Sequence, residues 1–349
     1  MLQPCTSLWG KAEIRDELPR IEVFEDVVYL PYKHRGAWGL FDADRKVIEP
    51  SVDRCRDGET PNQKTEWPAE IGAVDDTAPA DEYLYLGCMN LHYGHFIINT
   101  LARYWSLPVD RPPGLPLLCH GPGRTADWRR FKPVARVLSN LGLQVEELST
   151  FDRPMRIRRV VVPHTSLREQ AYAHRIFGKL CRRIGSPLLA DHVPQIDARP
   201  IYLSKLKMKS GVGRFLQEDV FTDTFAKAGF DIVFPEELTF KEQLRLFASR
   251  PVVAGTMTSA FHTSIFSRPG CRIVGLSPIP QVNSNFALID KLNGNKASYF
   301  YAPGTTYSNG GGFLTSASVS DGRGAADALV TLARRSPPCV EMPDTQSPD

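Results

Sequence analysis

The stretch PVVAGTMTSAFHTSIFSRPGCRIVGL occupies residues 251–276 and decides the fold class. A short apolar run at 252–254 stops at Gly255 and opens into a loop rich in hydroxyl groups. About two apolar turns follow, and a second run of β-forming residues covers 272–276. This order of strand, loop, helix and strand predicts a βαβ unit. Because the first N–H groups of a helix lack partners within the helix and lie at the positive end of its dipole, the loop is a candidate phosphate site.

Length and composition are those of a folded globular protein with two domains. The chain has 349 residues, of which 42% are hydrophobic and 23% are charged. This length allows two cores of ordinary size. The formal net charge of +3 is too small to indicate a nucleic-acid partner, although it is compatible with an anionic ligand.

The sequence gives no sign of membrane insertion or of a disulfide framework. Residues 1–20 lack the pattern of a signal peptide, and no apolar run approaches the ~20 residues needed to span a bilayer. The seven cysteines are odd in number and widely spaced, with no C-x-x-C pair. We therefore expect reduced thiols and a cytoplasmic location.

Residues 21–51 have the pattern of short strands and turns. Asp42 and Asp44, in the segment FDADRKV, could grip a divalent ion as a D-x-D pair. Aspartates also tolerate left-handed backbone and bond their own main chain, so a hairpin tip is the stronger interpretation. Residues 54–80 are rich in Asp, Glu, Thr and Pro and predict an exposed connection.

Strand-like and helix-like segments alternate from residue 82 onward, which predicts an α/β fold with helices on the faces of its sheets. A basic helix is expected at 166–184 and an interdomain linker at 185–199. In the second half, Thr239 and Glu242 have the spacing of a capping box. The predicted strands there are 201–204, 231–234, 252–254 and 272–276, and the predicted helices are 217–228, 240–249 and 324–335. We expect three parts: an N-terminal α/β domain with a β-hairpin region at 1–190, a Rossmann-like domain at 191–336, and a polar tail at 337–349.

The first candidate site follows a predicted strand at 83–86. The next segment, NLHYGHF at 90–96, lies where a strand ends and a helix begins, which is where open α/β sheets bind ligands. His95, Asn99 and Arg103 recur every four residues and share one helix face. That face could line a cleft, or it could meet solvent with His95 as a helix cap. His92 and His95 could also hold a metal, but no third ligand is indicated nearby.

Two further candidates are loops of the second half. Lys205 and Arg214 flank a basic loop containing two glycines, and their charges could neutralise a diphosphate; a solvated basic loop is the alternative. Gln217, Glu218 and Glu236 are ambiguous, because acidic residues are common at helix starts. The loop after residue 254 supplies hydroxyl groups and a histidine, although such a loop is often only a helix cap. Its polar residues are Thr256, Thr258, Ser259 and His262.

Together these segments resemble glycosyltransferase family 61, formerly a domain of unknown function, which includes plant xylosyltransferases and animal O-GlcNAc transferases of the secretory pathway. One match is residues 90–101, a small polar loop followed by His-Phe and an amphipathic helix. A second is IYLSK at 201–205 with Gly-Arg at 213–214 and Gln-Glu at 217–218. The most specific is Phe-Pro-Glu at 234–236, Leu-Thr-Phe-x-x-Gln at 238–243 and AGTMTSAFHTSIF at 254–266.

The chain departs from the family pattern at five positions. Lys205 stands where the family has Arg, Gln217 where it has Asn, and Met257 where it has a loop His; Thr258 and Thr263 replace Gly and Asn. Lysine keeps the charge of arginine but loses its bidentate fork. These departures motivate an alternative from another class, a sugar-nucleotide-binding or assembly protein without turnover. Another GT-B-like enzyme, such as a sugar-nucleotide epimerase, is a second alternative.

The resemblance implies a GT-B architecture of two Rossmann-like domains with a central cleft, and an inverting, metal-independent transfer from a nucleotide-diphosphate sugar to a hydroxyl group. No cofactor beyond this donor is expected. The implied base is His95, with His92 second. Residues implied on the acceptor side are Asn90, Asn99 and Arg103. Residues implied on the donor side are Lys205, Arg214, Glu236, Gly255, Thr256, Met257, Thr258, Ser259 and His262.

The expected biological setting is bacterial surface-glycan synthesis. The acceptor would be a precursor of capsule, lipopolysaccharide or exopolysaccharide, free or linked to a lipid. Basic segments at 129–136, 153–159 and 179–183 could hold the protein at the inner face of a membrane, or they could be ordinary solvated surface. The oligomeric state is left open.

Overall fold

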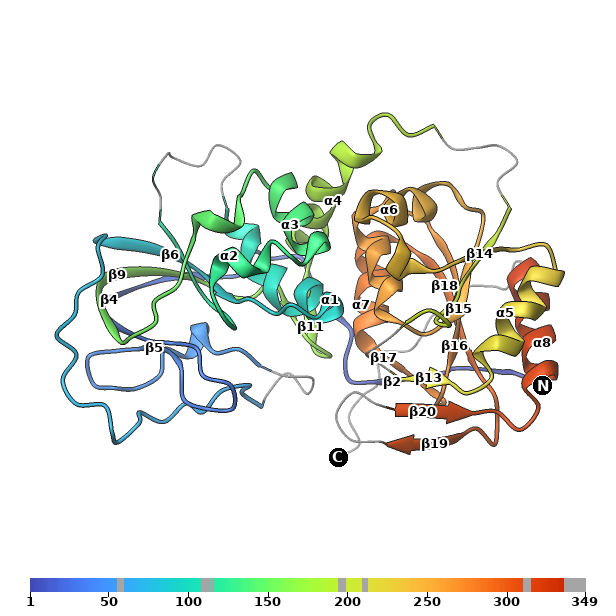
Figure 1. The fold of residues 1–349 in the computed structure, drawn as a ribbon, viewed down its shortest axis with the longest axis horizontal. Coiled ribbons are helices and arrows are strands. Elements are labelled where there is room, and N and C mark those ends of the chain that lie inside the picture. Colours follow the sequence, from blue (N-terminus) through green and yellow to red (C-terminus); the bar gives the residue numbers. More distant parts are fainter. Residues whose placement is uncertain are drawn as a thin grey trace. The chain divides into compact units, whose positions relative to one another are not determined.

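The computed structural model describes residues 1–54, 60–107, 114, 116–193, 199–208, 213–309 and 315–335. The chain forms a mixed α/β structure with two compact units (Figure 1). One unit is Ile14–Leu180, and the other combines Met1–Glu13 with Cys181–Asp349. The first thirteen residues, expected in the N-terminal domain, thus group with the second half of the chain. The expected tail at 337–349 lies outside the described residues.

The unit Ile14–Leu180 is built on a mixed sheet. Its spatial order is β5-β4-β9-β6-β7-β8. The strands from β9 to β8 are parallel, whereas β4 is antiparallel to both β9 and β5. Its strands are β4 (Ile21–Leu30), β5 (Gly39–Phe41), β6 (Glu82–Cys88), β7 (Leu117–His120), β8 (Leu148–Ser149) and β9 (Met155–Pro163).

The D-x-D segment after β5 is a tight turn, as the stronger of the two interpretations predicted. The Asp42 carboxylate accepts a hydrogen bond from the Lys46 amide at 2.9 Å, and the Arg45 amide donates to the Asp42 carbonyl at 3.0 Å. Arg45 has φ 64°, in the left-handed region. Asp42 therefore organises its own turn.

Helical segments of this unit are short. They are η1 (Glu49–Ser51), α1 (Tyr93–His95), η2 (Phe96–Thr100), η3 (Leu101–Ser106), α2 (Thr125–Trp128), α3 (Lys132–Asn140) and η4 (Val145–Glu147). The segment from Tyr93 to Ser106 changes from α to π to 3-10 geometry. Such a local π turn inside a helix often accompanies a functional site.

The basic helix expected at 166–184 begins later. Helix α4 is Arg175–Leu189, and the residues before it form the hairpin strands β10 (Leu167–Arg168) and β11 (Tyr172–His174). Gln170, with φ 55°, allows the turn between these strands. The helix also continues into the expected linker. A Cβ on Gly185 would lie 1.9 Å from the Phe266 carbonyl oxygen, so only glycine permits this close packing.

The second unit contains a sheet with the spatial order β1-β18-β16-β15-β12-β14. Strands β14, β12, β15, β16 and β18 are parallel, and β1 closes one edge antiparallel to β18. If the five parallel strands are numbered along the chain, their spatial order from β14 to β18 is 2-1-3-4-5. This is a doubly wound order, and its switch point lies between β12 and β15. The strands are β1 (Gln3–Pro4), β12 (Ile201–Leu203), β14 (Asp231–Val233), β15 (Val253–Thr256), β16 (Arg272–Ser277) and β18 (Lys296–Tyr301).

Helices cover both faces of this sheet. In Figure 1, α5 (Glu218–Lys227) and α8 (Gly322–Arg334) lie on one face, and α6 (Phe240–Ser249) and α7 (Ser284–Asn293) lie on the other. The strand Val253–Thr256 is buried throughout, as expected for a parallel strand covered on both sides. The predicted capping box is confirmed: the Glu242 amide donates to Thr239 Oγ1 at 3.3 Å, and the Thr239 amide donates to Glu242 Oε2 at 2.7 Å.

The predicted βαβ unit is confirmed with one difference. The segment between β15 and β16 is a 3-10 helix, η6 (Ser259–Phe266). Every residue from Ala260 to Phe266 is buried, so this short helix has no solvent face. Several later elements were not predicted: β17 (Gln281–Asn283), α7, β18, β19 (Thr306–Asn309) and β20 (Thr315–Ser318).

No helix in the described ranges combines the length and apolar character required to cross a bilayer. The described cysteines are unpaired, and Cys55 and Cys339 lie outside the described residues.

Candidate functional site

A bulge at the end of β6 prepares the first candidate site. The register between β6 and β7 shifts between Tyr85 and Cys88, and bulges of this kind often lie beside active sites. The loop that follows is held by Thr100, which donates to the Cys88 carbonyl at 3.0 Å and accepts from the Asn90 amide at 2.9 Å. Asn90 in turn accepts from the His92 amide at 2.9 Å. The side chain of Asn90 therefore shapes the loop.

The helical segment after this loop has one apolar face and one polar face. Ile97, Leu101 and Tyr104 are fully buried. On the polar face, His95 Nδ1 lies 3.1 Å from Asn99 Oδ1. Asn99 also lines a cavity of about 110 Å³ together with Arg103. The sharper of the two interpretations, a polar stripe that faces a cavity, therefore fits Asn99 and Arg103.

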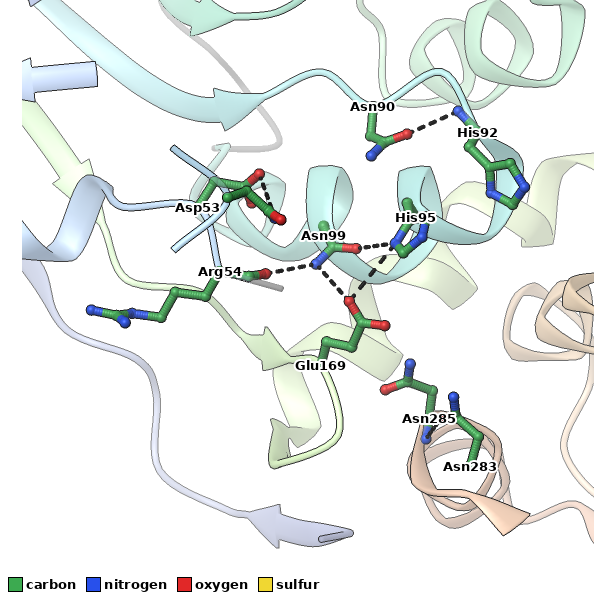
Figure 2. A network of polar contacts seen from close by, with 10 residues as sticks. Asp53, Arg54, Asn90, His92, His95, Asn99, Glu169, Asn283 and Asn285 are labelled. Carbon is green, nitrogen blue, oxygen red and sulfur yellow. Dashed lines mark hydrogen bonds and ion pairs between the residues drawn. The ribbon is translucent and has the colours of Figure 1, made fainter. Parts of the chain in front are cut away.

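A buried glutamate completes an array with the histidine (Figure 2). Glu169 is 7% exposed, and its Oε2 accepts a hydrogen bond from Asn99 Nδ2 at 3.3 Å and lies 3.8 Å from His95 Nδ1. Asn99 Nδ2 also donates to the Arg54 carbonyl at 3.4 Å. Since the amide nitrogen of Asn99 faces two oxygen atoms, its Oδ1 must face His95. This arrangement assigns the proton of a neutral His95 to Nδ1 and its lone pair to Nε2.

A second carboxyl group lines the same cavity. Asp53 accepts a hydrogen bond from Asn62 Nδ2 at 3.1 Å. Burial raises the pKa of Asp53 to about 6, against the opposing effects of the Asn62 hydrogen bond and of the charges of Arg103 and His95. Glu169 raises the same pKa by repulsion. These groups are thus close enough to form one electrostatic unit around the cavity.

Arg103 is an internal cation beneath this cavity. Its side chain is 4% exposed and donates to the carbonyl oxygens of Pro163 and, at 3.5 Å, of Val52. Gly87 makes room for it: this residue has φ +84°, and a Cβ there would lie 2.9 Å from Arg103 Cδ. The guanidinium therefore fixes the backbone that carries the neighbouring Asp53 and offsets its negative charge.

His92 lies beside His95, with ring centroids 5.4 Å apart. Burial and the neighbouring His95 lower the pKa of His92, which favours its neutral form near pH 7. Across the described ranges, no group of three or more His, Cys, Asp or Glu side chains has an arrangement that could hold a metal ion.

The second candidate site lies at the carboxyl edge of the sheet in the other unit, at the switch point between β12 and β15. Lys205 lies two residues after the end of β12 and is 4% exposed. Its Nζ donates to the Met257 carbonyl after β15 at 2.7 Å and to the Gly213 carbonyl at 3.0 Å. Burial lowers the pKa of Lys205 to about 8, and the charge of Glu218 opposes this shift. The lysine thus connects the ends of β12 and β15, at the position where open α/β sheets bind ligands.

Glu218, ambiguous in the sequence, is a buried part of this second site. Its Oε1 accepts from Tyr202 Oη at 2.9 Å and from the Lys205 amide at 3.1 Å, and its Oε2 accepts from Thr256 Oγ1 at 3.1 Å. Burial raises the pKa of Glu218, while Lys205 and the hydrogen bonds oppose the rise. The carboxyl group therefore ties the ends of β12 and β15 to the start of α5.

The residues of the loop after β15 play different parts. Gly255 and Thr256 are the last residues of the strand, and Met257 contributes its carbonyl oxygen to Lys205. Thr258 is the N-cap residue of η6. Ser259 begins that helix and is partly exposed.

Three other predicted donor residues lie apart from these contacts. His262 is 6% exposed, and its ring lies 4.7 Å from that of Phe286 in α7. Arg214 is exposed at the start of β13 (Arg214–Phe215), and Glu236 is exposed in η5 (Pro235–Glu237). Gln217 donates to Ser318 Oγ at 2.9 Å and so connects to β20.

Sequence reasoning missed Asp53 and Glu169 and left Glu218 ambiguous. Asp53 follows η1 in an irregular segment, and Glu169 occupies a hairpin turn. Neither position belongs to a periodic pattern that would mark it. A signal did exist for Glu218, because it is the Glu of the Gln-Glu pair at 217–218, but the helix-dipole explanation was equally good.

The structure thus combines a doubly wound sheet that has a buried lysine at its switch point with a histidine–carboxylate array in the other α/β unit. The Glycosyltransferase 61 family model matches residues 93–274, more than half of the chain. The chain therefore belongs to the glycosyltransferase 61 family, as the sequence predicted. Comparison with curated proteins gave no match.

Proposed function

We propose that the protein is an inverting, metal-independent glycosyltransferase that moves a sugar from a nucleotide-diphosphate sugar to a hydroxyl of a surface-glycan precursor. The observation that carries this proposal is the array of His95, Asn99 and Glu169. It directs the Nδ1 proton toward Asn99 and leaves the Nε2 lone pair as the proton acceptor. An imidazole of this kind can act as a general base near neutral pH.

The proposed reaction is a single displacement at the anomeric carbon. The acceptor hydroxyl transfers its proton to His95 Nε2 as its oxygen forms the new glycosidic bond. The bond between the anomeric carbon and the diphosphate oxygen breaks with its electron pair on the departing nucleotide diphosphate. Glu169 Oε2, 3.8 Å from Nδ1, would stabilise the positive charge that His95 acquires.

Lys205 is the proposed partner of the departing diphosphate. An ammonium group has three N–H donors, and the carbonyls of Met257 and Gly213 take two of them. Within the described part of the chain, the third has no protein acceptor in the hydrogen-bond network of Lys205. We propose that it binds a phosphate oxygen. Arg214, Glu236, Ser259 and the rest of the loop after β15 remain proposed donor contacts.

The finer architecture and setting are also proposals. A GT-B arrangement assigns the donor to the doubly wound unit and the base to the other unit, in agreement with the separate positions of Lys205 and His95 in the chain. We propose cytoplasmic action on a glycan or lipid-linked glycan acceptor, with peripheral attachment to the inner face of the membrane through the basic segments.

The test measures nucleotide diphosphate release from a panel of sugar nucleotides, with and without candidate hydroxyl acceptors. We expect slow donor hydrolysis by the wild-type protein and a fall in transfer rate of about 10²–10⁴ for His95→Gln. Donor-induced thermal stabilisation should stay the same. Exposed His34 offers a matched control, His34→Gln.

The possible results separate the alternatives. Near-normal transfer by His95→Gln would reject the base assignment. Donor binding with neither hydrolysis nor transfer would favour a sugar-nucleotide-binding protein. An altered sugar nucleotide formed without any acceptor would indicate an epimerase. Glu169→Gln should lower the rate less than His95→Gln and should shift the acidic limb of the pH–rate profile, which a purely structural role would not do.

A further inference from the structure

A second cavity lies in the unit that contains the doubly wound sheet, between the last turns of α4 and the end of η6. Its volume is about 310 Å³. Its lining combines apolar residues, among them Phe266, Leu189 and Pro269, with arginines and serines. The polar residues that line it are Arg182, Ser186, Ser267 and Arg268.

This cavity and the proposed donor site lie at opposite edges of the doubly wound sheet. Helix η6 runs from the carboxyl end of β15 toward the amino end of β16, which begins at Arg272. Ser267, Arg268 and Pro269 therefore lie at the amino edge of the sheet. Lys205 lies at the carboxyl edge, after β12. A ligand in this cavity cannot be the diphosphate that Lys205 would bind.

Arginines near the cavity lack acidic partners. Arg182 donates to the Leu292 carbonyl at 3.2 Å, and Arg268 donates to the His192 carbonyl at 3.1 Å. Neither forms an ion pair with a carboxylate in the described ranges. The last turn of α4 adds carbonyl oxygens here, so the arginines, not a helix dipole, supply the positive charge.

Polar atoms in this region are buried without partners. Ser267 is 2% exposed and lines the cavity, and its Oγ has no hydrogen-bond partner among the described residues. The same holds within those residues for Arg245 Nε, on α6, and for His192 Nε2. Because an unsatisfied buried polar atom destabilises the folded state, such a group calls for a ligand or another specific explanation.

The local field is positive. Burial lowers the pKa of His192, and the charges of Arg245 and Arg268 lower it further. Both arginines are thus close enough to His192 to act on it. Arg182, Arg268 and the buried Ser267 line the cavity, and none of the described residues that line it carries a carboxylate.

We propose that this cavity binds the phosphate group of an organic phosphate. Guanidinium groups match phosphate oxygens in geometry and charge, and the orphaned Ser267 hydroxyl supplies a further donor. The apolar lining residues, such as Phe266 and Leu189, would contact the organic part of the ligand. The phosphate could belong to a soluble metabolite or to a phospholipid headgroup, since both present the same oxygens.

The test uses inorganic phosphate as the probe on the full chain. Isothermal titration at constant ionic strength, with chloride as the reference anion, measures the dissociation constant of phosphate. We expect Arg268→Gln to raise that constant at least tenfold, and Ser267→Ala to raise it severalfold. Ser267→Ala removes no hydrogen bond between described residues. Weaker phosphate binding by this variant would therefore not result from loss of folding.

Two control variants locate the binding. Arg323→Gln removes an exposed arginine on α8 and should leave the constant unchanged. Lys205→Met should remove only phosphate bound at the proposed donor site, at the other edge of the sheet. The proposal is overturned if Arg268→Gln and Ser267→Ala bind phosphate as the wild type does. It is equally overturned if Lys205→Met alone abolishes binding.

Vesicle sedimentation distinguishes the two sources of the phosphate group. Phosphatidylcholine vesicles with and without phosphatidylglycerol are mixed with the wild-type protein and the Arg268→Gln variant. Binding that requires phosphatidylglycerol and is lost in the variant assigns the site to a lipid headgroup. Phosphate binding without such vesicle binding assigns it to a soluble organic phosphate. The result does not depend on whether His95 is the catalytic base.

Discussion

Acid should destabilise the unit Ile14–Leu180 through a single buried histidine, His120. Its Nδ1 lies 2.9 Å from Tyr85 Oη, and its Nε2 lies 3.0 Å from the Leu30 carbonyl. The ring is fully buried and stacks on Tyr29 with centroids 4.1 Å apart. Burial lowers the pKa of His120 to about 3, against the opposing effect of the Leu30 hydrogen bond.

The magnitude follows from proton linkage. An unfolded histidine has a pKa of about 6.5, so the unfolded chain binds the proton first as the pH falls. The contribution to stability is therefore complete above pH ~6.5 and is lost progressively down to pH ~3. At about 1.4 kcal/mol per pKa unit, the loss between pH 8 and pH 5 is about 2 kcal/mol, and the full loss is about 5 kcal/mol.

The assay compares urea unfolding of the wild-type protein and His120→Gln at pH 8 and pH 5. Four of the five tryptophans belong to this unit, and Trp38 lies 5.0 Å from the His120 ring, so tryptophan fluorescence reports its unfolding. Glutamine does not titrate but can still donate and accept a hydrogen bond. We expect the wild type to lose about 2 kcal/mol more than the variant.

Other titrating groups cancel in this comparison. Asp53, with a pKa raised to about 6, contributes in the opposite sense, because its stabilisation is present at low pH and lost as the pH rises through 6. It does so in both proteins. An equal loss in wild type and variant would refute the reasoning about His120.

Three further perturbations test the site and the fold. Lys205→Met should raise the donor dissociation constant, measured by titration, roughly 10- to 100-fold. In the wild type, kcat/KM should fall above pH ~8 as the lysine loses its proton. Lys205→Arg should move this fall in kcat/KM to higher pH. Gly87→Ala should cost about 1–3 kcal/mol, because of its positive φ and the contact with Arg103, and should reduce transfer; unchanged Tm and rate would contradict this. Thr239→Ala should cost about 1 kcal/mol by removing the helix cap, with no change in kcat, so a lost activity would show that this end of α6 takes part in the reaction.

The sequence predicted best those elements whose signals are local. Helix α6 was predicted with its observed bounds, because a capping box and an i, i+4, i+7 apolar pattern coincide there. The βαβ unit around Gly255 was predicted because its two β-forming runs, the loop and the apolar turns follow one another directly in the chain. Helix α7 was missed although Asn283 caps it, because most of its residues are buried and no polar face marks it.

The candidate site was only partly predictable. His95 and Asn99 share a short helical segment, and their spacing revealed their common face. Asp53 and Glu169 reach the same cavity from an irregular segment and a hairpin turn that lie far apart in the chain. No short-range sequence pattern predicts that Asp53 and Glu169 lie close together, because the pairing of distant strands determines their positions. The bridge from Lys205 to Met257 was also hidden, since it uses a backbone carbonyl.

Strand β1, near the start of the chain, completes the doubly wound sheet, whose other strands come from the second half of the chain. Gln3 and Pro4 pair with Tyr301 and Phe300 of β18, and Leu2 joins the core beneath them. During synthesis these first residues must therefore wait for almost all of the remaining chain before they find their partners. A fragment that begins at Cys181 would display an open β18 edge, the kind of surface that pairs with other chains. A separate peptide of the first thirteen residues would pair with this edge of β18, so we expect the peptide and the fragment to reassemble into one unit.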